Sequence, residues 1–152
     1  MSISIIPLDR DNEAALLVLW RAYQEFYRTR EIDEAKNQAH VRLIRESPAL
    51  GRIHLAVDGG VAIGFSTLYF SFTSTRVCQV AVLNDLFVTP ERRGAGVGRA
   101  LIEHAFALAR GEGIRFVRWL TEASNTGAQQ LYRHYGEPTS WKLYSVDVEA
   151  RS

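Results

Sequence analysis

A chain of 152 residues, 47% of them hydrophobic, has the size and apolar content of one globular domain with its own core. The 18 basic and 17 acidic side chains nearly cancel, which argues against a nucleic-acid-binding protein, since such proteins usually carry a basic excess. A single cysteine excludes an internal disulfide, and the apolar stretches are too short and too often broken to span a bilayer. No secretory signal precedes the first strand-like segment, so we expect a cytoplasmic protein.

Apolar periodicity predicts a mixed α/β chain. In chain order we expect a strand at residues 3–8, a helix with Leu16, Trp20, Tyr23 and Tyr27 along one face, a helix at 35–45, strands at 53–57, 61–72 and 77–88, a helix at 97–109, a strand at 114–120, a helix at 126–135 and a last strand at 141–148. Asp9 or Asp11 is expected to cap the first helix, and Asp58-Gly59-Gly60 suits a tight hairpin turn. Because hairpins come first and helix crossovers later, we predict one mixed, mostly antiparallel sheet with flanking helices.

The most informative segment joins the strand that ends at Val88 to the helix that begins at Val97. It contains the run Arg93-Gly94-Ala95-Gly96-Val97-Gly98-Arg99. Glycines let the backbone approach a bound group, and the free N–H groups at a helix start favour an anion. A pyrophosphate suits such a site, and Arg93 or Arg99 can add charge-assisted hydrogen bonds.

Three phosphate-binding patterns compete for this loop, beside a glycine-rich turn that binds nothing. A Walker-type loop needs Lys and then Ser or Thr after its last glycine, where this chain has Arg99-Ala100. The dinucleotide pattern G-x-G-x-x-G fails because its last position falls on Arg99 or Leu101. The pattern R-x-x-G-x-G is filled by Arg93, Gly96 and Gly98.

A second motif follows at Asn125-Thr126-Gly127-Ala128-Gln129-Gln130-Leu131-Tyr132, with an asparagine before a helix and a tyrosine within it. Together the two motifs resemble the Gcn5-related N-acetyltransferase superfamily, and the resemblance covers most of the chain. Residues 83–88, 119–125 and 128–132 are most similar to the histone-and-polyamine acetyltransferase group.

The resemblance implies an acyl-coenzyme A N-acyltransferase fold in a single domain over residues 1–152. The implied reaction is direct transfer of acetyl from acetyl-coenzyme A to a primary amine: a polyamine, a protein lysine side chain or a small amino compound. A homodimer, joined through the last strand, is a further implication.

The resemblance also implies a binding site at a gap between the strand at residues 86–88 and the strand at 116–120. The pantetheine arm would pair there with the backbone of Leu86 and Val88, and a backbone N–H near Phe87 would polarise the thioester carbonyl. The implied coenzyme A-binding residues are Leu86, Phe87, Val88, Arg93, Gly94, Ala95, Gly96, Gly98, Arg99 and Asn125. For Asn125, a plain helix cap is the alternative.

Two catalytic residues are predicted. Tyr132 matches the family's acid by position, and a phenol of pKa about 10 can protonate a departing thiolate. Relatives that act on polyamines carry a glutamate where this chain has Asn84, and an amide accepts no proton at neutral pH. The neighbouring Asp85 is therefore the candidate base, although strand alternation allows only one of these two positions to face the cleft. A water chain and Glu122 are alternatives.

A coenzyme A-binding regulatory module without turnover remains an alternative, whereas Arg99 disfavours a dinucleotide-binding protein. The four histidines lack metal-ligand spacing, so no metal site is expected. Cys78 and the aromatic residues of the first helix are expected to be packing residues rather than a nucleophile and a pocket.

Overall fold

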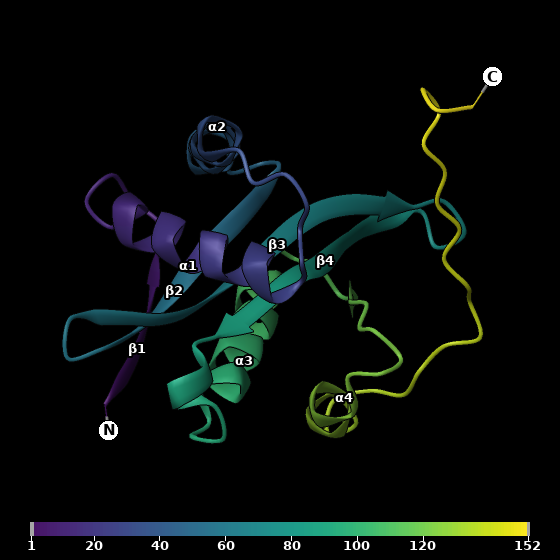
Figure 1. The fold of residues 1–152 in the computed structure, drawn as a ribbon. Coiled ribbons are helices and arrows are strands. Elements are labelled where there is room, and N and C mark those ends of the chain that lie inside the picture. Colours follow the sequence, from purple (N-terminus) through teal and green to yellow (C-terminus); the bar gives the residue numbers. More distant parts are fainter. Residues whose placement is uncertain (1, 152) are drawn as a thin grey trace. The chain divides into compact units, whose positions relative to one another are not determined.

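The computed structural model of the chain describes residues 2–151. The chain divides between Leu120 and Thr121 into two compact units. The first unit contains a five-stranded sheet and three α-helices, and the second contains one short helix, α4 (Thr126–Tyr132), and the C-terminal segment (Figure 1). No helix among the described residues has the length and apolar character needed to cross a membrane.

The sheet confirms the predicted mixed topology. Its strands are β1 (Ile3–Pro7), β2 (Gly51–Asp58), β3 (Val61–Thr73), β4 (Cys78–Val88) and β5 (Val117–Arg118), and they lie in that order. The first three neighbouring pairs are antiparallel, and β4 and β5 are parallel. Gly59 and Gly60 have φ values of +57° and +81°, as the tight turn between β2 and β3 requires.

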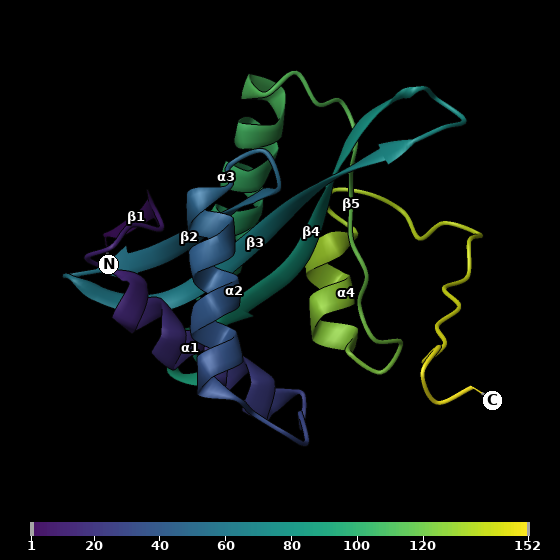
Figure 2. The same ribbon diagram turned by 90° about the horizontal axis from the view of Figure 1, so that it is seen from above.

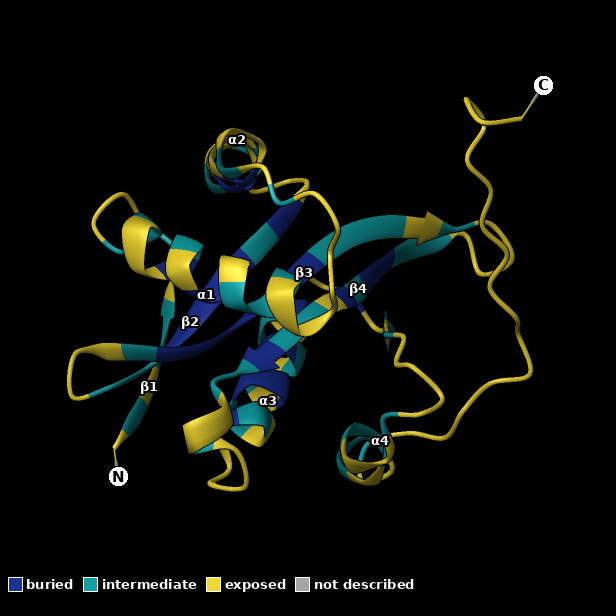
Figure 3. Cartoon of the chain, in the orientation of Figure 1, coloured by how far each residue is buried: buried dark blue, intermediate teal, exposed yellow. Residues whose placement is uncertain are grey.

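Helices cover both faces of the sheet in the first unit (Figure 2). On one face, α1 (Glu13–Phe26) and α2 (Glu34–Glu46) contribute Leu16, Trp20 and Val41 to a core that includes Phe65 and Phe87 of the sheet. On the other face, α3 (Val97–Gly111) places Val97 and Leu101 against Ala56 and Ile63. The colours of Figure 3 show that the buried residues of this unit concentrate in the central strands of the sheet.

The prediction that Asp9 or Asp11 caps α1 is wrong. The N-cap residue is Asn12, and its side chain caps no N–H group of the helix. The Asp9 carboxylate instead accepts the N–H groups of Asp11 and Asn12, at 2.8 and 2.9 Å. Asp9 therefore stabilises the turn before the helix, because that turn offers N–H groups closer in sequence than the first helical turn does.

The predicted last strand at residues 141–148 is not a strand in the structure. Its side chains are largely exposed: the exposed fraction is 87% for Trp141 and 89% for Tyr144. A strand needs a hydrogen-bonding neighbour, and the described part of the second unit contains no strand that could pair with it. The prediction of a strand here is therefore wrong, because the alternating pattern says nothing about whether a pairing neighbour is present.

Two other elements are shorter than expected. The strand predicted at residues 114–120 reduces to Val117–Arg118, because only these two residues pair with β4. The helix predicted at 126–135 ends at Tyr132, whose carbonyl oxygen accepts the N–H groups of Tyr135 and Gly136 in a closing turn.

Candidate functional site

The outer edge of β4 is only partly paired. On that side Ala81 and Val82 pair with Val117 and Arg118 of β5, and the Ala81 N–H donates to Phe116 O at 3.0 Å. Beyond this point, residues 83–88 pair with β3 alone among the described residues. An unpaired strand edge offers alternating N–H and C=O groups, so an extended ligand can bind there as an added strand.

A β-bulge interrupts β4 at Asn84. Thr67 of β3 lies opposite Asp85, whereas the next residue, Leu68, lies opposite Leu83, so Asn84 is the extra residue. The bulge breaks the strict alternation of side chains. That alternation was the basis for expecting only one of Asn84 and Asp85 to face the cleft. Across the bulge, Asn84 Nδ2 donates to Asp85 Oδ2 at 3.1 Å.

Asp85 lies on the face that α1 and α2 cover. Its Oδ2 accepts a hydrogen bond from the hydroxyl of Thr67, a residue with no exposed surface. Tyr69 follows on the same face of β3, and burial together with the nearby Asp85 carboxylate raises the pKa of its phenol to about 12. His40 of α2 completes the group, with Nε2 2.9 Å from the Tyr69 hydroxyl. Of these side chains, sequence reasoning found only Asp85.

The glycine loop has the backbone shape that its sequence predicts. Gly94 and Gly96 have φ values of +79° and +86°, and a Cβ at either position would meet no atom within 4 Å. Their conformation, rather than tight packing, therefore favours glycine. α3 begins directly after Gly96, and the first bond into the helix runs from Ala100 N–H to Gly96 O at 3.0 Å. The N–H groups of residues 97–99 thus lie at an open helix start, which favours an anion.

The two arginines of the loop differ in their surroundings. Arg93 Nε donates to Val88 O at 3.0 Å, and its guanidinium lies 4.8 Å from the ring centre of Phe26 and 5.8 Å from that of Phe87. This side chain therefore bends toward the face that α1 covers, the same face that carries Asp85. Arg99 is exposed in the first turn of α3.

Asn125 and Tyr132 belong to the second compact unit. Asn125 is the N-cap residue of α4, and its Oδ1 accepts the N–H of Ala128 at 3.2 Å, so the structure has the helix cap that the sequence suggested as its alternative role. Gln129 ties the preceding loop by donating to the carbonyl oxygens of Glu122 and Ala123. Tyr132 is half-buried at the end of α4.

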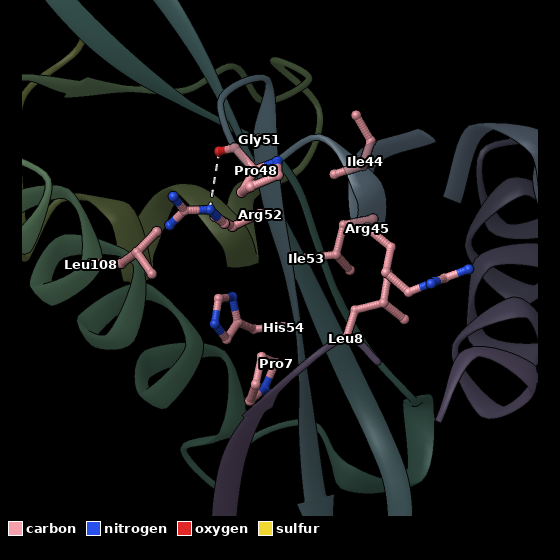
Figure 4. A pocket seen from close by; sticks show the side chains of 10 residues that line it. All are labelled: Pro7, Leu8, Ile44, Arg45, Pro48, Gly51, Arg52, Ile53, His54 and Leu108. Atoms are coloured by element: carbon pink, nitrogen blue, oxygen red, sulfur yellow. Dashed lines mark hydrogen bonds between the residues drawn. The ribbon is translucent and has the colours of Figure 1, made fainter. Parts of the chain in front are cut away.

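A hollow of about 190 Å³ lies elsewhere in the first unit (Figure 4). Its lining residues are Pro7, Leu8, Ile44, Arg45, Pro48, Gly51, Arg52, Ile53, His54 and Leu108. None of the predicted site residues lines it, so the hollow is separate from the β4 edge. Two residues that the sequence left scattered meet beside it: the rings of His54 and His104 lie 4.3 Å apart.

The β4 edge and the glycine loop are continuous in the chain, and together they fit one ligand. Residues 83–88 suit an extended arm, and the loop that follows presents an anion-binding helix start. In coenzyme A, an extended pantetheine arm is joined to a diphosphate. The fold and this arrangement are therefore compatible with the binding of an acyl-coenzyme A.

Comparison with known proteins gives the family. The model of the acetyltransferase (GNAT) family matches residues 14–136, and the chain belongs to this family. It is 34% identical to a D-amino-acid N-acetyltransferase of Saccharomyces cerevisiae, over 93% of this chain and 89% of that protein. A Bos taurus thialysine N-epsilon-acetyltransferase is 28% identical over 61% of this chain and 57% of its own length.

Solved structures agree on the fold. An aminoglycoside N-acetyltransferase in complex with coenzyme A superposes with a TM-score of 0.83 at 21% identity, covering 96% of this chain and 95% of that one. The family assignment and the predicted fold class are thereby confirmed. The protein is an acetyl-coenzyme A-dependent N-acetyltransferase, and this disfavours the alternative of a regulatory module without turnover.

Proposed function

We propose that the enzyme acetylates the primary amine of a free amino acid or a similar small amino compound. The observation that carries this proposal is the pairing of opposite charges on one face of the sheet. Asp85 lies there with its carboxylate, and the guanidinium of Arg93 lies over Phe87, two residues further along β4. An amino acid carries an ammonium group and a carboxylate, which match this pair of charges.

The names of two relatives support an amino-acid acceptor. One is called a D-amino-acid N-acetyltransferase and the other a thialysine N-epsilon-acetyltransferase. Polyamines and protein lysines, the other acceptors that the sequence suggested, carry the amine but lack a free carboxylate close to it. Arg93 would then have no counterpart in those acceptors.

Each group of the chain has a definite role in the proposed reaction. Acetyl-coenzyme A supplies the acetyl group as a thioester whose carbonyl carbon an amine can attack. The backbones of Leu86 and Val88 hold the pantetheine arm, the N–H near Phe87 donates to the carbonyl oxygen, and the loop from Arg93 to Arg99 holds the diphosphate through its amides.

Protons move in opposite directions at the two ends of the reaction. Asp85 accepts a proton from the ammonium group, because only the amine with a free electron pair can attack a carbonyl carbon. Tyr132 donates its phenol proton to the sulfur that leaves, and the nitrogen of the new amide releases a further proton that restores the phenol. Asn125 orders the start of α4, the helix that carries Tyr132.

An acceptor panel tests the proposal. Purified protein is assayed for coenzyme A release with D- and L-amino acids, thialysine, spermidine, an aminoglycoside and a histone-tail peptide. We expect the highest kcat/KM among the amino acids. Turnover with spermidine or the peptide far above that with every amino acid would contradict the proposal.

A matched pair of acceptors isolates the role of Arg93. Lysine and 1,5-diaminopentane differ only in the carboxylate, so Arg93→Gln should raise KM for lysine and leave KM for the diamine nearly unchanged. One lost charge-assisted hydrogen bond corresponds to about a tenfold rise in KM. Equal effects on the two acceptors would remove Arg93 from acceptor binding and assign it to the loop.

Three further expectations remain part of the proposal. One acetyltransferase domain over residues 1–152 and a cytoplasmic location are supported by the composition and the single cysteine. A homodimer is supported by the row of exposed apolar side chains at residues 141–148, which includes Trp141 and Tyr144. Light scattering on the purified protein measures the oligomeric state.

A further inference from the structure

The sheet is open beside the first residues of β2. β1 pairs with β2 as far as Pro7, which lies opposite His54, and the N–H of Leu8 donates to Ile53 O at 2.9 Å. The hollow of about 190 Å³ lies beside residues 51–54 of β2, and residues near the ends of α2 and α3 line it as well (Figure 4). At about 30 Å³ for each water molecule, it has room for about six waters or one small organic molecule.

The polar lining of the hollow comes mainly from β2. The side chains of Arg52 and His54 share one face of the strand, because residues two apart on a strand point the same way. Figure 4 shows both of them on the side of Leu108. Arg45 also lines the hollow, but its guanidinium points toward α1, where Nε donates to Glu13 Oε2 at 2.7 Å. Arg52 is therefore the cation that a guest in the hollow would meet.

The ring of His54 is buried without a hydrogen-bonding partner among the described residues. Its exposed fraction is 8%, and the ring of His104 packs against it with the ring centres 4.3 Å apart. Over the described chain, every side-chain nitrogen of a non-exposed residue that solvent cannot reach has a partner. Solvent therefore reaches the ring nitrogens of His54, which lines the hollow, and these nitrogens can bind a guest there.

Arg52 has donors left over for the same guest. Its Nε donates to Pro48 O at 3.1 Å and its Nη1 to Glu112 Oε1 at 2.7 Å, whereas Nη2 has no acceptor among the described residues. Guanidinium N–H groups suit the oxygens of a carboxylate, and a neutral imidazole adds one further N–H donor. The positive charge of Arg52 disfavours a cation in the hollow.

The rest of the lining is apolar. Leu8, Ile44, Ile53 and Leu108 contribute hydrocarbon side chains to it. An inorganic anion would leave this surface in contact with water, whereas an apolar group bound there would cover it. Donors on one side and hydrocarbon around them fit a carboxylate joined to a small apolar body.

We propose that the hollow is a binding site for a small organic carboxylate. The carboxylate oxygens accept hydrogen bonds from Nη2 of Arg52 and from the ring of His54. The apolar body lies against Leu8, Ile44 and Leu108. None of the predicted coenzyme A-binding or catalytic residues lines this hollow, so the inference does not depend on the proposed function.

Binding of the carboxylate should be linked to uptake of a proton by His54. In the free protein, burial and then the charges of His104 and Arg52 lower the pKa of His54 to about 4. A carboxylate beside the ring favours its charged form and raises that pKa. Affinity should therefore rise as the pH falls from 7 to 5, where a carboxyl group of pKa about 4 is still mostly ionised. The charged and titratable groups at this hollow, besides His54, are Arg52 of β2, His104 of α3, Glu112 just beyond α3, Arg45 of α2 and Glu13 of α1.

Imidazole NMR of the purified protein tests the proposal with benzoate as the probe. At pH 5, benzoate should bind with a dissociation constant of about 1 mM, about tenfold tighter than at pH 7, and should raise the pKa of His54 to about 5 or above. Benzamide has the same ring without the charge, and phosphate has charge without an apolar body. Both should bind at least about tenfold more weakly than benzoate.

Two results of the titration would overturn the proposal. One is no saturable change in the His54 signals with benzoate up to about 20 mM, since the hollow would then hold water alone. The other is binding of benzamide or phosphate as tight as that of benzoate. The His54 signals are assigned by their loss in His54→Gln, and in that variant benzoate affinity should change less than about twofold between pH 7 and 5.

Substitutions at the charged groups locate the binding. Arg52→Gln should weaken benzoate binding about tenfold. Glu112→Gln should strengthen it, because this change frees Nη1 of Arg52 for the ligand. Arg42→Gln is the control, since Arg42 is exposed on α2 and does not line the hollow. Wild-type affinity in both Arg52→Gln and Glu112→Gln would overturn the proposal, and so would an equal loss in Arg42→Gln and Arg52→Gln.

Discussion

Burial controls the acid–base behaviour of His54 on β2. The pKa of its ring is lowered to about 4, first by burial and then by the positive charge that His104 and Arg52 present nearby. Burial also lowers the pKa of His104. Figure 4 shows the His54 ring beside Arg52, whose Nε donates to Pro48 O at 3.1 Å. A neutral imidazole is therefore part of the folded state at this place.

The lowered pKa predicts acid destabilisation. Above pH 6.5, His54 is neutral in both states and its contribution to stability is complete. Between pH 6.5 and about 4 the unfolded chain takes up a proton that the folded chain refuses, so stability falls as the pH falls. From pH 7 to 5 we expect a loss of about 2 kcal/mol in the free energy of unfolding, measured by urea titration.

Two variants identify the group responsible for this loss. In His54→Gln the free energy of unfolding should change less between pH 7 and 5 than in the wild type. In His134→Gln, a substitution at an exposed position, it should change as much as in the wild type. If the dependence is equally steep in His54→Gln, the cause lies in another group.

The phenol of Tyr132 is the proposed proton donor to the departing sulfur. Tyr132→Phe removes that proton and keeps the ring, so kcat should fall about 100-fold or more while the dissociation constant of coenzyme A stays nearly constant. Steady-state kinetics and calorimetry measure the two quantities separately. Unchanged turnover would exclude Tyr132 from the mechanism.

The start of α3 shows how one element acquires a function from its backbone. Gly96 is its N-cap residue in the left-handed region, and the N–H groups of the next three residues face away from the helix body. Gly64 on β3 serves another purpose: a Cβ there would lie 2.6 Å from the carbonyl oxygen of Phe87. One glycine allows a backbone conformation, and the other allows two strands to approach.

Gly96→Ala tests the role of that conformation. An L-residue at φ +86° costs about 1–2 kcal/mol, and relief of this strain would turn the amides away from the bound diphosphate. We expect coenzyme A to bind about tenfold more weakly in calorimetry. Gly111→Ala is the control, because Gly111 ends the same helix without a positive φ and with no atom near the added Cβ. Equal affinities in the two variants would contradict the assignment of the loop.

Over the chain as a whole, ligand binding should raise stability, because acetyl-coenzyme A binds the folded state alone. At a concentration about 100 times its dissociation constant, the gain is about 2.7 kcal/mol. A chain of this length should then melt about 6–10 °C higher in a thermal scan. Nicotinamide adenine dinucleotide is the control and should give no shift. No shift and no heat of binding with acetyl-coenzyme A would refute the site at the β4 edge.

Local sequence was sufficient to predict a structural feature wherever that feature depends on residues that are neighbours along the chain. Apolar periodicity predicted the helix that carries Leu16 and Trp20 and the helix at 97–109, which correspond to α1 and α3. Asp58-Gly59-Gly60 predicted a turn because glycine adopts positive φ without strain. The loop at Arg93 to Gly98 was recognisable for the same reason. The family and its co-substrate followed from residues adjacent in sequence.

Features that join distant segments depended on the fold. The bulge at Asn84 arises from the register of β4 against β3, and it brings Asn84 and Asp85 together where alternation predicted separation. The contacts of His40 with Tyr69 and of Thr67 with Asp85 each join two different elements, so no spacing in the sequence predicts them. The segment at residues 141–148 has the alternation of a strand yet no strand in its own unit to pair with. Pairing, register and burial are relations between segments, and the chain acquires them only when it folds.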